Sequence, residues 1–170
     1  DFCLSRGLGD VYKRQVVTND RGITVWLKGN RVSRNQIMAI KEESVTDQKN
    51  SLTVCLDNIL RHAGITRNTE YDLAQGKTAI QILEENMTGV QVLDLSGCSL
   101  DAVLYYVNQD IPVLAILEDG EAVLVTGFNE FNVVIMEPST GKLYKKGMND
   151  ATTWFAENGN HFISYMKIEN

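Results

Sequence analysis

The sequence is poor in cysteine and histidine, and each of these two shortages argues against a class of functional site. Its three cysteines show no Cys-x-x-Cys spacing, so they predict neither a zinc site nor a redox motif. Two histidines are too few to predict a metal centre. The glycines are scattered and form no phosphate-binding loop. We therefore expect no metal and no cofactor.

Long apolar runs and an excess of basic residues are also missing. No run approaches the ~20 apolar residues that cross a bilayer as a helix, so these residues contain no predicted transmembrane segment. The 22 acidic residues outnumber the 16 basic ones and give a net charge of −6. Because nucleic-acid binding depends on Lys and Arg that neutralise phosphates, this balance excludes nucleic acid as an expected partner.

The first 15 residues show neither a helical nor a strand period. Within them, Ser5–Gln15 matches the translation of a transposon adaptor that is used to prepare sequencing libraries. We interpret residues 1–15 as a disordered artefact of that adaptor and exclude them from fold reasoning. On this interpretation the natural N-terminus is missing, and the sequence gives no information about a signal peptide.

The remaining residues have the length of one ordinary domain. Residues 16–44 are predicted to form an upstream hairpin and a linker, because short alternating runs flank a turn and a polar stretch follows. Residues 45–170 are predicted to form the domain itself.

The first half of this domain is predicted to be mainly helical. Ser51–Gly64 spaces its apolar residues at i, i+3 and i+4, with Ser51 as the expected N-cap and Gly64 at the C-terminal end. Ser99 is the expected N-cap of a later helix. In chain order, the further elements predicted here are helices at 69–75 and 78–87, a strand at 90–95 and a helix at 100–109.

The second half is predicted to be an antiparallel sheet. Two Val-rich runs, 121–128 and 133–137, flank the turn-forming residues 129–132, which is typical of a hairpin. Helices followed by an antiparallel sheet give the α+β fold class. The other elements predicted in this half are strands at 112–117, 142–146 and 161–166 and a helix at 150–157.

This order of elements, with a hairpin that ends in an acidic residue and a proline, resembles papain-like cysteine peptidases of the bacteriocin-processing (double-glycine) family. The resemblance covers residues 45–168. It implies N-terminal helices packed on a C-terminal antiparallel sheet, with a groove between helix and sheet.

The resemblance also implies a set of site residues. Its register places Ser51 where the family has its nucleophilic cysteine, Glu121 where it has the catalytic histidine, and Glu137 where it has the orienting aspartate. Pro138 follows Glu137, as in the family. Gln48 is the candidate for the oxyanion-hole glutamine, although it precedes Ser51 by only three residues.

These side chains differ in chemistry from the catalytic ones. A serine hydroxyl is not ionised at neutral pH, and a carboxylate with an ordinary pKa of about 4.3 is a poor base for it. If Glu121 and Glu137 lie side by side, their repulsion would raise one pKa and make a pair able to act as acid or base. Cys55, one helical turn after Ser51, is either a core thiol or an alternative nucleophile. Whether Cys55 is bonded to Cys98 stays open.

Other conspicuous residues have structural interpretations. Trp154 and Phe155 are expected in the core. His62 lies near the end of its helix, where a cation favours the helix dipole. His161 opens the last strand and is expected at the surface or at an edge.

Three hypotheses follow. In the first, a catalytically degenerate papain-like domain of a larger bacterial protein binds a peptide segment or an adjacent domain in its former active-site groove. In the second, the chain is an active cysteine or serine peptidase that uses Cys55 or Ser51 with Glu121 and Glu137. In the third, the upstream segment of the chain itself fills the groove. The resemblance to secretion-linked peptidases suggests a membrane-associated or extracytoplasmic location.

Overall fold

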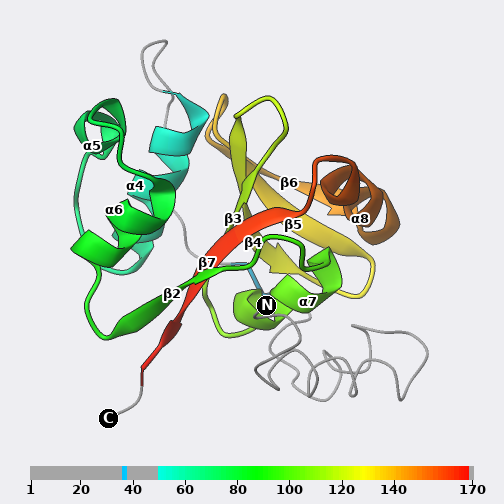
Figure 1. Cartoon of the computed structure of the whole chain (residues 1–170). Coiled ribbons are helices and arrows are strands. Elements are labelled where there is room, and N and C mark those ends of the chain that lie inside the picture. The colour runs from blue at the N-terminus through cyan, green and yellow to red at the C-terminus, as the bar shows by residue number, and fades with distance from the viewer. Residues whose placement is uncertain (1–35, 38–49, 169–170) are drawn as a thin grey trace.

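The structure is a computed structural model that describes residues 36–37 and 50–168 (Figure 1). The segment 1–15, most of the upstream segment 16–44, and Gln48 lie outside the described residues. The predictions made for them are therefore not addressed by the structure.

Helices and an antiparallel sheet alternate in the order that the sequence predicts, and the α+β fold class is confirmed. Each predicted element from residue 51 onward is present, with ends that differ by at most two residues. The helices are α4 (Ser51–His62), α5 (Glu70–Ala74), α6 (Ala79–Asn86), α7 (Leu100–Val107) and α8 (Met148–Glu157). The strands are β1 (Gln36–Ile37), β2 (Val90–Asp94), β3 (Val113–Ile116), β4 (Ala122–Phe128), β5 (Asn132–Glu137), β6 (Lys142–Gly147) and β7 (His161–Lys167).

The sheet is antiparallel throughout, in the order β2-β7-β3-β4-β5-β6. Strands β3 to β6 form a meander, and β7 then returns to lie between β2 and β3. Helices α4 to α6 lie together on one side of this sheet, and α8 lies on the other side, near β5 and β6 (Figure 1). Every residue of β4 is buried, so both faces of this central strand are covered.

Part of the upstream segment joins the sheet. Gln36 pairs with Phe128 and Ile37 pairs with Gly127, at the end of β4. At these positions one edge of β4 is paired with β5. Strand β1 therefore pairs with the other edge of β4, the edge that pairs with β3 earlier in the strand. Residues 36–37 therefore belong to the sheet, although the sequence assigned them to a segment before the domain.

The N-cap of α4 is Asn50, and the prediction that Ser51 caps this helix is wrong. Asn50 has extended backbone angles, and its side chain accepts a hydrogen bond of 2.7 Å from the Thr53 amide. Ser51 is therefore the first helical residue, and its hydroxyl is available for another contact. At the other end, Gly64 adopts a φ of +87°, the left-handed conformation that ends many helices.

Candidate functional site

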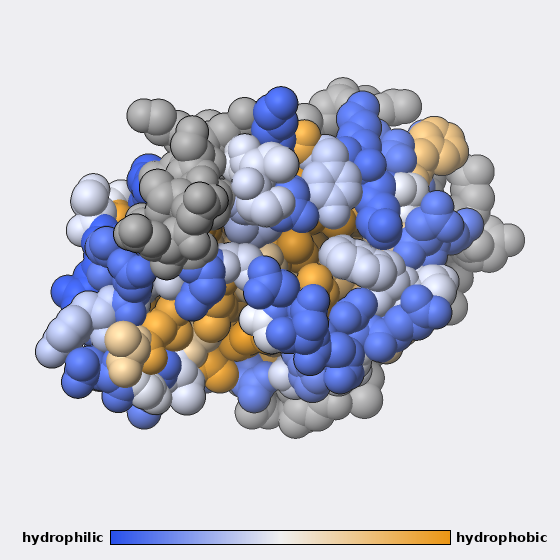
Figure 2. All heavy atoms as spheres, turned by 90° about the horizontal axis from the view of Figure 1, so that it is seen from above, coloured by the Kyte–Doolittle hydropathy of each residue, from blue (hydrophilic) through white to orange (hydrophobic). Residues whose placement is uncertain are grey.

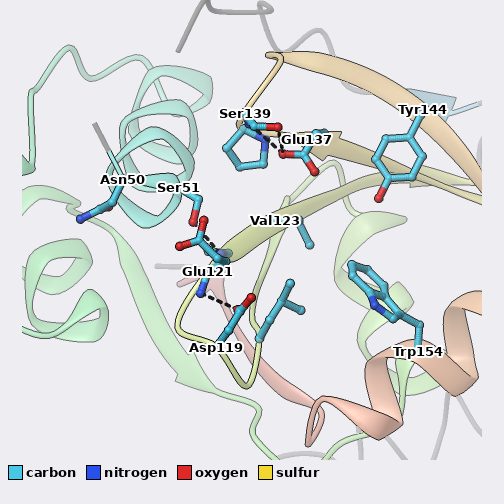
Figure 3. Close-up of a pocket in the computed structure, with 12 residues that line it drawn as sticks. Asn50, Ser51, Asp119, Glu121, Val123, Glu137, Ser139, Tyr144 and Trp154 are labelled. Atoms are coloured by element: carbon cyan, nitrogen blue, oxygen red, sulfur yellow. Dashed lines mark hydrogen bonds between the residues drawn. The ribbon is translucent and has the colours of Figure 1, made fainter. Parts of the chain in front are cut away.

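Three of the predicted site residues, Ser51, Glu121 and Glu137, line a pocket between the start of α4 and the sheet. The pocket has a volume of about 390 Å³. Seen from above, the molecule is hollowed near its centre, and apolar side chains show in the hollow between hydrophilic rims (Figure 2). The lining residues, most of them labelled in Figure 3, are Asn50, Ser51, Leu117, Asp119, Glu121, Ala122, Val123, Glu137, Pro138, Ser139, Tyr144 and Trp154.

Ser51 joins the helix to the sheet. Its Oγ accepts a hydrogen bond of 2.8 Å from the backbone amide of Ala122, 71 residues later in the chain. Ala122 is the first residue of β4 and is only 1% exposed, so this amide has little access to water. The bond ties the start of α4 to the start of β4 across the pocket.

Glu121 and Glu137 lie in the same pocket as Ser51 but have different neighbours. The Glu121 carboxylate points toward Ser51 (Figure 3). Glu137 Oε1 accepts hydrogen bonds of 2.7 Å from both the amide and the hydroxyl of Ser139. Within the described part of the chain, no hydrogen bond joins the two glutamates. The structure therefore brings the three predicted positions together without forming a hydrogen-bonded carboxylate pair.

Cys55 lies inside the protein rather than in the pocket lining. It is a free thiol, which excludes the Cys55–Cys98 disulfide that the sequence left open, and it is fully buried. Burial is the main cause that raises its pKa well above the ordinary value, and the charges of Glu137 and Glu121 raise it further. Because the thiolate is the reactive form, this environment is the opposite of what an activated nucleophile requires.

Neither histidine of the chain lines the pocket. His62 lies at the last residue of α4, about 17 Å along the helix axis from Ser51, and its Nε2 is 3.0 Å from the Asp110 carbonyl oxygen. His161 opens β7 and pairs with Ile116. Since the chain has two histidines, the pocket contains no imidazole that would take a proton from Ser51.

Two aromatic side chains form a wall of the pocket that sequence reasoning missed. Tyr144 belongs to β6 and is 37% exposed. Burial, and then the charge of Glu137, raises the pKa of its phenol. Trp154 belongs to α8 and is partly buried: it packs against the core, as predicted in part, and also lines the pocket. Phe155 beside it is 1% exposed, as predicted.

Asp119 is the third carboxylate of the pocket and was also missed. Its Oδ1 accepts a hydrogen bond of 3.0 Å from the Glu121 amide, which fixes the turn between β3 and β4. In the sequence, Asp119 and Gly120 form an Asp-Gly pair, which is typical of turns, and the position of Asp119 two residues before Glu121 was the available clue to its place in the pocket.

The described residues show no arrangement that would hold a metal ion. No group of three or more His, Cys, Asp or Glu side chains is placed for coordination in residues 50–168. None of the helices in this part of the chain is both long and apolar enough to cross a membrane.

Comparison with solved structures shows the fold. The chain is similar to a protein described as a C39-like peptidase from Bacillus anthracis, with a TM-score of 0.63 over 79% of this chain and 99% of that chain. This chain has a papain-like peptidase fold. The predicted packing of N-terminal helices on an antiparallel sheet is thus confirmed. The two sequences are 14% identical, so the likeness shows the fold alone. No family model and no curated protein sequence matches.

The burial of Cys55 in this papain-like domain predicts slow alkylation. With iodoacetamide at neutral pH, we expect Cys55 to react only when the protein opens, because its thiol is both inaccessible and neutral. A cysteine placed at the exposed position Glu84 (Glu84→Cys) is the reference for a normal rate, with peptide mass spectrometry to assign each site. Rapid labelling of Cys55 in the folded protein would show a low-pKa thiol and contradict this description.

The bond between Ser51 and Ala122 predicts a measurable contribution to stability. Ser51→Ala leaves the buried Ala122 amide without this acceptor, and we expect a loss of about 1–3 kcal/mol in the free energy of unfolding. Ser139→Ala is the matched control, because Ser139 is exposed and lies in the same pocket, and it should change stability by less than about 0.5 kcal/mol. Equal urea midpoints for Ser51→Ala and the unmodified chain would contradict the role of this bond.

Proposed function

We propose that this papain-like domain binds a peptide segment or an adjacent protein domain in the groove between α4 and the sheet, and does not cleave it. One observation carries the proposal: the pocket at the start of α4 is lined by two serines, one tyrosine and three carboxylates, and by no histidine. We also propose that the domain is a catalytically degenerate part of a larger bacterial protein.

In this proposal Ser51, Glu121 and Glu137 occupy the positions of a former cysteine, histidine and aspartate. A common pocket for the three residues supports this assignment. Peptide hydrolysis by Ser51 would require a base that takes the hydroxyl proton, and the titratable groups beside it are carboxylates, which are weak bases at neutral pH. Gln48, the oxyanion candidate, stays a prediction.

The hydrogen bond of Ser51 also favours a structural role for this residue. Its Oγ already accepts the Ala122 amide proton, so an attack on a substrate would have to weaken the bond that joins α4 to β4. A nucleophilic hydroxyl is instead normally hydrogen-bonded to its general base. The contact therefore supports a serine that holds the groove together.

The pocket itself has the properties of a ligand site. A volume of about 390 Å³ lies within the range of roughly 300–1,000 Å³ that is usual for ligand pockets. It combines apolar residues such as Val123 and Pro138 with polar groups whose positions are fixed by hydrogen bonds. Tyr144 and Trp154 add the aromatic surface that is common in recognition sites.

The proposal predicts peptide binding without hydrolysis. Random dodecapeptides displayed on phage and selected on the 170-residue chain should yield a consensus, and synthetic peptides of that consensus should bind and stay intact. Tyr144→Ala should weaken binding by about tenfold or more, since aromatic anchors often carry more than 1 kcal/mol. Tyr71→Ala is the matched control, because Tyr71 is 70% exposed and lies on α5, outside the pocket.

Two results would overturn the proposal. One is the absence of any selected peptide whose binding depends on Tyr144. The other is cleavage of the peptides that is abolished by Ser51→Ala or by Cys55→Ala, which would show an active serine or cysteine peptidase.

A further inference from the structure

Three carboxylates line the pocket. Asp119 and Glu121 come from the turn and residue before β4, and Glu137 comes from the end of β5. None of the described residues that line the pocket is Lys, Arg or His. Hydrogen bonds from the Glu121 amide and from Ser139 hold two of these carboxylates in place. A cation in the pocket would be attracted by these carboxylates.

One of the aromatic rings that line the pocket packs against an ammonium group of the chain itself. Lys146 Nζ lies 4.9 Å from the centroid of the Trp154 ring, within the range of a cation–π contact. Lys146 belongs to β6 and is not among the lining residues, whereas the Trp154 ring is. The aromatic wall of the pocket is therefore a surface against which a positive group of this chain itself packs, and the Tyr144 ring extends it.

The glutamates of the pocket also affect the pKa values of two nearby uncharged groups, the Cys55 thiol and the Tyr144 phenol. Besides burial, which is the larger cause in each case, the charges of Glu137 and Glu121 raise the pKa of Cys55, and that of Glu137 raises the pKa of Tyr144. Cys55 lies one turn into α4, and Tyr144 lies in the aromatic wall. The charge of Glu137 therefore acts on groups in both α4 and β6.

We propose that this pocket binds the cationic side chain of a lysine or arginine in the peptide or protein segment that occupies the groove. Glu121 and Glu137 pair with the charge, and Tyr144 and Trp154 pack against its alkyl chain or guanidinium plane. The inference rests on the proposed function, because the cation belongs to the same ligand. It adds the chemical class of residue that the groove selects.

The test uses the 170-residue chain and the dodecapeptides selected from the random library. We expect each binding peptide to contain a lysine or arginine, and its replacement by norleucine, which keeps the alkyl chain and removes the charge, to weaken binding by about tenfold or more in calorimetry. The double variant Glu121→Gln/Glu137→Gln should bind the charged peptide more weakly by a similar factor. Its affinity for the norleucine peptide should stay nearly unchanged. Glu84→Gln removes one charge from the exposed face of α6, outside the pocket, and should change neither.

Ionic strength gives a readout that needs no variant. Added salt should weaken the binding of the charged peptide and should change the binding of the norleucine peptide little. The inference is wrong if the selected peptides lack basic residues, if norleucine peptides bind equally well, or if acetylation of the peptide N-terminus alone abolishes binding, which would assign the cation to the terminal ammonium. In these three cases peptide binding, and with it the proposed function, still holds. If no peptide binds, both proposals fail.

Discussion

The site depends on the contact between the first residue of α4 and the first residue of β4. Asn50 caps the helix, so the Ser51 hydroxyl is free to accept the Ala122 amide proton across the pocket. This bond joins residues 71 positions apart and ties the start of α4 to the start of β4, next to Glu121. Because Ala122 is buried, the bond forms where water competes little for the amide.

The core and the pocket are specified by different parts of the same elements. The apolar faces of α4 and β4 are buried and fix the papain-like packing, whereas Ser51, Glu121 and Glu137 stand at element ends, where a side chain can change without disturbing that packing. A fold of this kind can therefore keep its groove while the chemistry at the groove changes. Here the groove holds carboxylates and aromatic rings, a combination suited to recognising a cation.

Periodicity was enough to predict the elements, and Ser99 accepts the hydrogen bond expected of the N-cap that the sequence predicts there. The common pocket of Ser51, Glu121 and Glu137 came from the resemblance, not from spacing. Three features were out of reach. Asn50 and Ser51 are both good caps, so the sequence could not choose between them. Trp154 lines the pocket only because α8 packs near β6, which the sequence does not show. The position of β7 between β2 and β3 is a long-range pairing that no local pattern encodes.

The most direct test of the account is the reactivity of Ser51 toward a fluorophosphonate, which phosphonylates an activated serine with loss of fluoride. Intact mass and peptide mapping of the folded chain would be read after incubation at neutral pH. The account predicts an unmodified Ser51, because its hydroxyl is held by the Ala122 amide and has no imidazole beside it. A stoichiometric adduct on Ser51 that forms in the folded chain and does not form in the unfolded chain would show an activated nucleophile and contradict the proposal of a non-catalytic groove.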